Sequence, residues 1–355
     1  MSKKDDIFES IIKVAPGTVF REGLENILNA KTGAIIVVGD SEEVLALVKG
    51  GFKIDCEYSP AKLYELAKMD GAIVLSEDTK RILFANAQLE PDSSISSNET
   101  GIRHRTAEKV AKQTGKLVIS ISQRRSIITL YKSNKRYVLQ DTSKVIIKAN
   151  QAVQTLENYK KALDTAMNVL TSLEFEDNVI LYDVCKVLQR TEMMMRIVEE
   201  IEKYIMELGS EGILVKMQLD ELTENVLEDC DNVIKDYLVS EKEVPAKNIR
   251  RQIRRLSSDE LWDLTTIAKI LGYEGATNML DHNVSTNGYR ILNKIPRIPV
   301  SIFDNLILAF GSFQDVLNAT PEKLEEVEGI GSKRAKVIKE KLNRLYEMVM
   351  QERTI

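Results

Sequence analysis

One uninterrupted apolar run limits the folds open to this chain. Ala34-Ile35-Ile36-Val37-Val38 contains no polar residue. Successive side chains of a strand point to opposite faces, so a wholly apolar strand needs cover on both faces of its sheet. Residues 72–76 and 116–122 also predict strands. The first 140 or so residues are therefore predicted to form a sheet with helices packed against it.

Helices and hairpins are predicted around these strands. Helical patterns or helix start and stop signals mark four segments, which are 7–14, 18–30, 60–69 and 106–113. Polar turns separate 72–76 from 81–89, and 127–131 from 136–139, so each pair is predicted to form a hairpin. The expected N-terminal domain is an α/β mixed sheet.

The stretch from Gly101 to Glu108 is the first candidate for chemistry. Arg103 and Arg105 flank His104, one of two histidines in the chain, just before the helix predicted from Thr106. A helix N-terminus offers free backbone N–H groups and the positive end of the helix dipole, and both favour phosphate. Arginine adds bidentate donors. A solvated helix start is the alternative.

Two more polar segments stand at the ends of predicted elements. In Asp70-Gly71 the carboxylate can bind a hard cation or accept a proton, and the glycine allows a ligand close to the backbone. Gln123-Arg124-Arg125 follows a strand. If each segment is considered alone, Asp70-Gly71 can be a turn that ends a helix, and Gln123-Arg124-Arg125 can be a solvated hairpin turn. Together with the Arg-His-Arg cluster they fit a polyphosphate and its metal ion. The sequence has neither a dinucleotide-binding glycine motif nor a P-loop.

Segments 68–76 and 103–107 resemble the diadenylate cyclase family. The motifs that carry the resemblance are Asp70-Gly71-Ala72 and Arg103-His104-Arg105, about thirty residues apart. The match covers roughly residues 8–140. The order of parts beyond it is similar to the family of bacterial DNA integrity scanning proteins, which adds a helical spine and a helix-hairpin-helix tail. The resemblance then extends over nearly the whole chain.

This resemblance implies an activity, a metal and a set of site residues. The activity is condensation of two ATP molecules into cyclic di-AMP with release of two pyrophosphates, helped by Mg²⁺ or Mn²⁺. Asp70 is implied as the metal-linked acid that helps to activate a ribose 3′-hydroxyl. The implied catalytic residues are Asp70, Arg103, His104 and Arg105. The residues implied to bind ATP or cyclic di-AMP are Gly71, Ala72, Leu89, Ile102, Arg103, His104, Arg105, Thr106, Ser122, Arg124 and Arg125.

The chain departs from the family pattern at two positions. Ile102 stands where threonine is expected, and Gln123 stands where a third arginine is expected. Each departure weakens one expected contact and leaves the two core motifs intact.

The implied reaction requires two copies of the site. Each ATP acts once as the nucleophile and once as the electrophile, which one pocket holding one ATP cannot provide. Two pockets that face each other across a two-fold axis can, so at least an isologous dimer is predicted. The family resemblance implies an octamer.

Beyond about residue 143 no strand is predicted for a hundred residues. Apolar residues recur three and four apart over 152–170, 179–208 and 213–238, which predicts a spine of three long antiparallel helices. The predicted domains are 1–141 (cyclase), 142–244 (spine) and 245–355 (all-α tail). The expected fold class is multidomain α+β.

The tail has its own charge and its own motif. Residues 245–355 hold 17 basic and 14 acidic side chains, a net charge of +3, whereas the whole chain carries −5. The segment 327–335 resembles a helix-hairpin-helix turn, whose glycines expose backbone N–H groups. The residues expected to bind DNA phosphates without reading sequence are Gly329, Ile330, Gly331, Lys333 and Arg334. Branched or damaged DNA as the target is implied by the family alone. A glycine turn used only for packing is the alternative.

Two other basic or hinge-like segments flank this motif. Arg250-Arg251 and Arg254-Arg255 fall at helical spacing, which fits a solvated face and a phosphate-tracking stripe equally well. They follow a predicted linker at 240–245 and precede a helix predicted from Ser258 to about Leu271. Residues 295–310 look like a degenerate partner hairpin with prolines where glycines usually stand.

Cysteine use and hydropathy predict a compartment. Cys56, Cys185 and Cys230 are far apart and odd in number, which is typical of reduced thiols. No run approaches the length of a membrane span, and the first residues show no signal-peptide pattern. We expect a soluble cytoplasmic protein, with a nucleoid association if the tail binds DNA.

Two functions fit these observations. The first is a diadenylate cyclase regulated by DNA that the tail holds. The second is a non-catalytic DNA-binding scaffold that senses ATP or cyclic di-AMP. Formation of a cyclic dinucleotide from ATP and Mg²⁺ distinguishes them.

Overall fold

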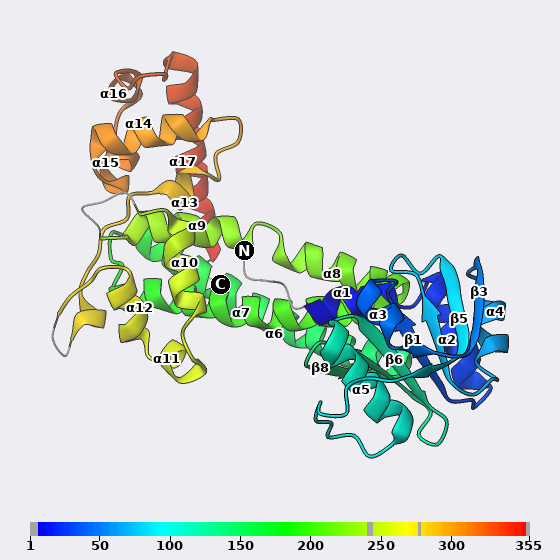
Figure 1. Cartoon of the computed structure of the whole chain (residues 1–355). Coiled ribbons are helices and arrows are strands. Elements are labelled where there is room, and N and C mark those ends of the chain that lie inside the picture. The colour runs from blue at the N-terminus through cyan, green and yellow to red at the C-terminus, as the bar shows by residue number, and fades with distance from the viewer. Residues whose placement is uncertain (1–5, 240–243, 276–277, 353–355) are drawn as a thin grey trace. The chain divides into compact units, whose positions relative to one another are not determined.

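The computed structural model describes residues 6–239, 244–275 and 278–352 (Figure 1). The predicted linker lies partly outside these ranges, at residues 240–243. The chain divides into two compact units. The first comprises Met1–Ala152 and Glu200–Gln218, and the second comprises Val153–Glu199 and Leu219–Ile355.

The first unit contains an eight-stranded mixed sheet. Its strands are β1 (Ala34–Val38), β2 (Val48–Lys49), β3 (Phe52–Glu57), β4 (Ala72–Leu75), β5 (Arg81–Leu89), β6 (Leu117–Ser122), β7 (Ile127–Lys132) and β8 (Lys135–Val138). The order is β2-β5-β4-β1-β6-β7-β8, and β3 also pairs with β5. β1 and β4 run parallel, and the other pairs are antiparallel. The predicted hairpins β4–β5 and β7–β8 are confirmed.

Helices cover both faces of this sheet, as the apolar run in β1 predicts. They are α1 (Asp6–Lys13), α2 (Val19–Asn29), α3 (Glu42–Ala46), α4 (Pro60–Leu66) and α5 (Ile102–Thr114). Apolar residues of α1, α2 and α4 pack with Ile36 and Val38 on one face. Those of α3 and α5 pack with Ile35 and Val37 on the other. The confirmed α/β domain is therefore a three-layer structure.

Long helices follow the sheet. They are α6 (Thr142–Phe175), α7 (Leu181–Leu208), α8 (Ile213–Thr223) and α9 (Val226–Tyr237). The prediction of one unbroken third helix over 213–238 is wrong. Asn225 takes a left-handed backbone conformation with a φ of 61°, which an α-helix of L-residues cannot continue through.

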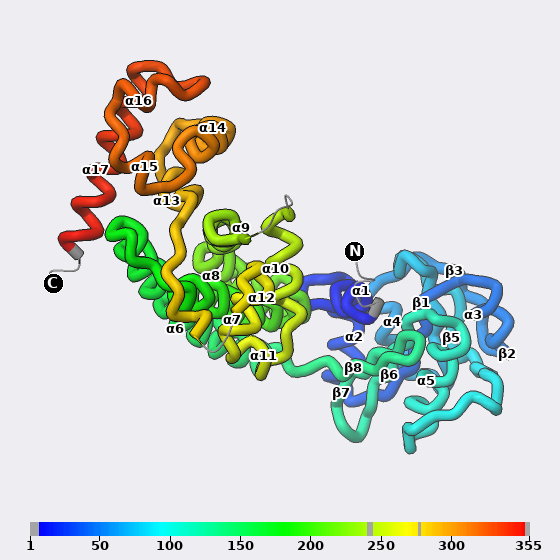
Figure 2. Tube along the Cα trace, turned by 90° about the vertical axis from the view of Figure 1, so that its left-hand side faces the viewer, coloured from blue at the N-terminus to red at the C-terminus, as the bar shows by residue number. Residues whose placement is uncertain are grey.

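Short helices form the rest of the second unit. They are α10 (Ala246–Arg254), α11 (Ser258–Trp262), α12 (Leu264–Ile270), α13 (Tyr289–Leu292), α14 (Val300–Phe310), α15 (Phe313–Asn318), α16 (Pro321–Glu325) and the longer α17 (Ser332–Glu352). The helix predicted from Ser258 to Leu271 is split, because the extended Asp263 ends α11 and caps α12. Figure 2 shows α14 to α17 grouped together. Their hydrophobic core includes Phe303, Leu306 and Phe313. In the described residues no helix is long and apolar enough to span a bilayer.

Candidate functional site

The sheet topology brings distant polar segments to one edge. β1 and β4 run parallel and begin at the same edge, where the antiparallel strands β5 and β6 end. Asp70-Gly71 precedes β4, Leu89 ends β5, and Ser122 ends β6. α5 packs on the face formed by Ile35 and Val37, as its apolar side requires.

The Arg-His-Arg cluster lies inside the first turn of α5, not before the helix as predicted. α5 begins at Ile102, and its N-cap is Gly101, which has no side chain to cap the free N–H groups. The N–H of Arg105 donates to the carbonyl of Gly101 at 2.8 Å. Successive residues of a helix point about 100° apart, so the three side chains of the cluster face three different surroundings.

Arg103 faces Asp70. Its Nη2 lies 3.6 Å from Oδ1 of Asp70, whose side chain is fully exposed. Gly33 provides the space for this guanidinium, because a Cβ at Gly33 would lie 2.7 Å from Nη1 of Arg103. An exposed ion pair of this kind contributes only about 0–1 kcal/mol. Both groups are therefore readily available to an incoming ligand.

His104 faces the sheet. Its Nδ1 lies 3.3 Å from Oγ of Ser120, and its ring meets that of Tyr131 edge to face. Burial lowers the pKa of His104 below 6.5, and Arg125 and Arg136 lower it further against the opposing effect of Glu99. At neutral pH His104 is accordingly an uncharged hydrogen-bonding group in the first turn of α5.

Arg105 holds the segment that leads into α5. Its Nε and Nη2 donate to the carbonyls of Glu99 and Thr100 at 3.3 and 3.5 Å. The carboxylate of Glu99 in turn accepts from Tyr131 at 2.8 Å and from Arg136 at 2.7 Å. In this arrangement Arg105 fixes the approach to the helix, and Arg103 is the cluster's contact with Asp70.

A pocket of about 710 Å³ joins the start of α5 to the end of β6. Its lining residues are Gly101, Ile102, Arg103, His104, Ile121, Ser122, Gln123 and Arg124. The volume suits a nucleotide-sized ligand, since small-molecule sites measure about 300–1,000 Å³. The two positions that depart from the family pattern, Ile102 and Gln123, both lie here, and the side chain of Ile102 is 82% exposed.

Other predicted residues lie beside this pocket and do not line it. Ala72 is buried in β4 and packs in the same core as Leu89 and Ala107 of α5. Gly71 has a φ of +90°, and a Cβ there would lie 2.8 Å from the backbone carbon of Asn86. Thr106 is half-buried in α5. Arg125 lines a different pocket, although its N–H donates to Oγ of Ser122 at 3.2 Å.

Gly33 and Ser120 position Arg103 and His104, and neither residue was predicted from the sequence. Neither residue belongs to a motif. The one local signal is the Lys31-Thr32-Gly33 turn directly before a buried strand. Contacts of this kind follow from strand pairing, which the local sequence does not reveal.

The donor set suits a metal ion that arrives with a phosphorylated ligand. In the part of the chain that the structure describes, no three His, Cys, Asp or Glu side chains cluster into a metal cage. Asp70 nevertheless offers an exposed carboxylate beside Arg103. Mg²⁺ is commonly held by one or two carboxylates together with substrate phosphates, so Asp70 fits as the protein ligand of such an ion.

The predicted DNA-binding segment forms a tight turn between α16 and α17. Gly329 has a φ of +85°, a conformation that favours glycine, whereas Gly331 has open space around its Cα. Ile330 is buried in the core of the helices. Lys333 is exposed in the first turn of α17, and Nη1 of Arg334 donates back to the carbonyl of Gly329 at 2.6 Å.

The turn between α13 and α14 repeats this backbone path. Arg297 takes the left-handed conformation there, with a φ of 67°, as Gly329 does in the second turn. The N–H of Ile295 donates to the carbonyl of Leu292, just as the N–H of Val327 donates to the carbonyl of Leu324. The degenerate hairpin thus keeps its shape without glycine.

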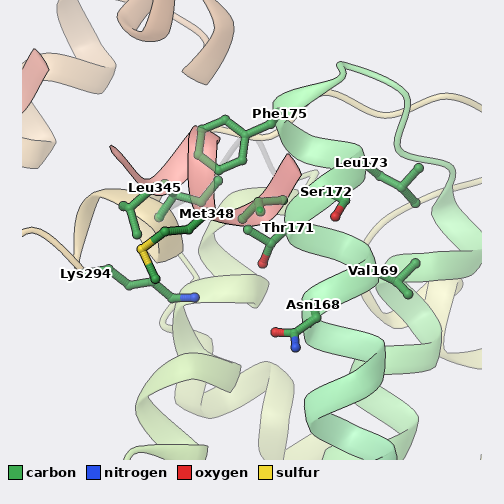
Figure 3. Close-up of a pocket in the computed structure, with 11 residues that line it drawn as sticks. Asn168, Val169, Thr171, Ser172, Leu173, Phe175, Lys294, Leu345 and Met348 are labelled. Carbon is green, nitrogen blue, oxygen red and sulfur yellow. The ribbon is translucent and has the colours of Figure 1, made fainter. Parts of the chain in front are cut away.

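Another pocket, of about 520 Å³, lies in the second unit (Figure 3). It is lined mainly by α6 and α17, and Figure 3 shows Lys294 and Asn168 directed toward the same space. None of the residues predicted from the sequence lines it. His282 serves structure, because its carbonyl accepts from the N–H of Leu181 at 3.0 Å.

Comparisons with known proteins identify the family. The family model "DisA bacterial checkpoint controller nucleotide-binding" matches residues 21–136, and "DisA bacterial checkpoint controller linker region" matches 139–280. The chain is 55% identical over 345 residues to the DNA integrity scanning protein DisA of Carboxydothermus hydrogenoformans, covering 97% of this chain and 98% of that protein. The chain belongs to the DisA family. The protein of the same name from Clostridium botulinum is 54% identical over 352 residues, covering 99% of this chain and 99% of that protein. The one from Acetivibrio thermocellus is 54% identical over 347 residues, covering 98% of this chain and 96% of that protein.

Membership of the DisA family gives the site its chemical class. The nucleotide-binding match spans β1, β4, the pocket and all of α5. The linker match begins just before α6. The expected order of a nucleotide-binding α/β domain followed by a helical region is confirmed, and the chain is a diadenylate cyclase.

Proposed function

We propose that two copies of this protein, with cyclase domains head to head, condense two ATP molecules into cyclic di-AMP. In each half-reaction a bond forms between a ribose O3′ and the α-phosphorus of the other ATP. The bond from that phosphorus to the β-phosphate oxygen breaks, and pyrophosphate leaves. The observation that carries the proposal is the 3.6 Å approach to Asp70 of Arg103, which itself lines a nucleotide-sized pocket.

Asp70 and Arg103 take the central roles. Asp70 holds the metal and helps to remove the proton of the 3′-hydroxyl, and Arg103 stabilises charge on the phosphate that is attacked. A bound Mg²⁺ or Mn²⁺ neutralises triphosphate charge and lowers the cost of the charge that develops during transfer. Phosphoryl transfer asks a protein mainly for positioning and electrostatic stabilisation, which these two flexible, exposed groups supply once the ligand orders them.

The remaining residues position the nucleotide. The uncapped N–H groups at the start of α5 and the side chains of Ser122 and Arg124 bind phosphate oxygens. Gly71, Ala72 and Leu89 form the wall beside the adenosine. His104 stays neutral and orients the first turn of α5 through Ser120. Arg105 keeps the approach to the helix in place.

The test of catalysis compares two acidic residues at opposite edges of the same sheet. Full-length protein is incubated with ATP and Mg²⁺, and the product is separated by chromatography. Asp70→Asn should lower the rate of cyclic di-AMP formation by about 10²–10⁴-fold. The matched control is Asp40→Asn, because Asp40 is exposed just beyond the far end of β1, and it should leave the rate unchanged. A wild type that yields no cyclic dinucleotide would favour the ATP-sensing scaffold.

We propose further that the C-terminal helices bind DNA without reading its sequence. The exposed Lys333 and the N–H groups after the Gly329 turn form a phosphate seat at the start of α17. The relatives' name, DNA integrity scanning protein, supports branched or damaged DNA as the partner and a place at the nucleoid. An octamer built from head-to-head pairs accords with the same family.

DNA bound at the tail regulates the cyclase in this proposal. The expected result is a change in the rate of cyclic di-AMP formation when branched DNA is added at saturating concentration. A linear duplex of equal length and composition is the control for charge alone. If branched DNA binds and the rate of cyclic di-AMP formation does not change, DNA binding and cyclisation are independent, which contradicts the proposed regulation.

A further inference from the structure

Among the helices of the described residues, α10 carries the densest positive charge. The structure divides that charge into two groups. Residues 246–255 contain five basic and no acidic side chains, namely Lys247, Arg250, Arg251, Arg254 and Arg255. The first group is tied to the spine. Nε of Arg250 lies 3.0 Å from Oδ1 of Asp231 in α9, and Arg254 pairs with Glu199 in α7.

The second group is Lys247, Arg251 and Arg255, which we call the α10 stripe. All three side chains are exposed, and within the described residues none of them forms an ion pair. The helix buries Ala246, Ile249 and Ile253 on its other side. At about 100° per residue the stripe is centred nearly opposite that buried side. It therefore lies on the exposed side of α10, where Lys247 and Arg251 also line a pocket of about 400 Å³ together with Glu192 and Glu199 of α7.

Helix stability does not account for this pattern. Cations are favoured near the C-terminus of a helix by its dipole, which explains Arg254 and Arg255. Lys247 stands in the first turn, where the same dipole disfavours a cation. The positive charge therefore extends along the exposed side of α10 to its first turn, where the helix dipole does not favour it.

The stripe suits a phosphate backbone better than an acidic protein surface. Residues four apart in a helix are spaced by about 6 Å along the axis and rotated by about 40° around it, so the three charges form a regularly spaced, gently winding row. The other exposed residues of α10 are Asn248, Gln252 and Arg254, whereas protein interfaces have apolar or aromatic centres. Arginine also binds phosphate bidentately.

We propose that the α10 stripe is a second DNA-binding surface that contacts backbone phosphates outside the α16–α17 turn. The proposal rests on the proposed DNA binding by the tail, and it extends that binding to residues in no predicted motif. Each phosphate that a cation neutralises releases counterions, so the stripe contributes to affinity in a strongly salt-dependent way.

The experiment measures the dissociation constant of the full-length protein for a mixed-sequence duplex at several salt concentrations. The stripe variant is K247Q/R251Q/R255Q. The matched control is K144Q/K161Q/K216Q, which removes the same charge from three exposed lysines of α6 and α8. The slope of log affinity against log salt should be smaller by about 2.7 in the stripe variant, at about 0.9 for each phosphate contact. Over a fourfold rise in salt, the wild type should then lose about 40-fold more affinity than the stripe variant.

The possible results separate this proposal from the one on which it rests. A stripe variant with the wild-type slope overturns the second surface, while weaker binding by Lys333→Gln would still support the tail turn. A wild type without salt-dependent DNA binding overturns both. Thermal unfolding checks the fold of the triple variant. If that variant does not fold, the single variant Arg251→Gln replaces it in the same measurement. Its slope of log affinity against log salt should be smaller by about 0.9. An unchanged slope would contradict the proposal.

Discussion

At the scale of single residues, the position of Arg103 depends on a missing side chain. Gly33 leaves room for the guanidinium that reaches Asp70. A methyl group at Gly33 would meet the far end of a flexible side chain, which can move away. Gly33→Ala should therefore change the free energy of unfolding by less than about 1 kcal/mol. It should lower kcat/KM for ATP by about 10–100-fold, because a misplaced catalytic group loses alignment.

A double-mutant cycle shows whether this loss acts through Arg103. In an Arg103→Gln background the guanidinium is already absent, so adding Gly33→Ala should have little further effect on kcat/KM. Equal losses from Gly33→Ala in both backgrounds would mean that the glycine serves some other purpose. Urea unfolding of each variant gives the accompanying stability.

The residues at the site show how far the sequence could predict it. Asp70 and Arg103 were predicted by motif, and the structure brings them within 3.6 Å. The different surroundings of Arg103, His104 and Arg105 were not predictable, because they depend on where α5 begins. Gly101 is an inconspicuous N-cap without a capping side chain, so the charged residues after it appeared to precede the helix.

At the scale of elements, periodicity located most of the strands and long helices. It failed where one residue interrupts a helix, as Asn225 does through its left-handed conformation and Asp263 through its extended one. It also gave no prediction for α3, β2 and β3. These elements are short and largely exposed, since β3 alternates between exposed and half-buried positions, and so they lack an apolar pattern.

A buried charge cluster joins α6, α9 and α13. Arg290 pairs with Glu174, and Oδ1 and Oδ2 of Asp236 accept from the N–H groups of Tyr289 and Arg290 at 2.6 and 3.1 Å. Tyr237 donates to Glu174 at 2.8 Å. Burial, reinforced by Glu174, raises the pKa of Asp236 to about 7. The folded protein therefore holds a proton that the unfolded chain releases near pH 4.

This raised pKa predicts the sign of a pH effect. Between about pH 4 and 7 the folded state binds more protons than the unfolded state, so the contribution of Asp236 to stability falls as pH rises through 7. Asp236→Asn keeps a neutral side chain at every pH. The difference in melting temperature, variant minus wild type, should therefore increase from pH 5 to pH 8.

Asp259→Asn is the control for that measurement, because Asp259 is an exposed carboxylate of the nearby α11. The difference in melting temperature between Asp259→Asn and the wild type should vary less from pH 5 to pH 8. A flat difference for Asp236→Asn would show that Asp236 is ionised in the folded protein throughout.

At the scale of the whole molecule, chemistry sets a requirement that one chain does not meet. Cyclic di-AMP contains two bonds of the same kind, each made between the O3′ of one nucleotide and the phosphorus of the other. The chain has one Asp70–Arg103 pair at its sheet edge. In the proposed dimer a second chain would supply the second pair, because an isologous contact presents identical groups to each other.

Mixing wild type with Asp70→Asn tests this requirement. Co-expression of the two chains in equal amounts should give random pairs, and a mixed pair can form only one of the two bonds. The rate of cyclic di-AMP production, divided by the total amount of both chains, should then fall to about a quarter of the wild-type value, because only wild-type pairs complete the ring. A mixture that retains about half the activity would show that each chain cyclises alone. Accumulation of the linear dinucleotide in the mixture, and its scarcity in the pure wild type, would identify the mixed pairs directly.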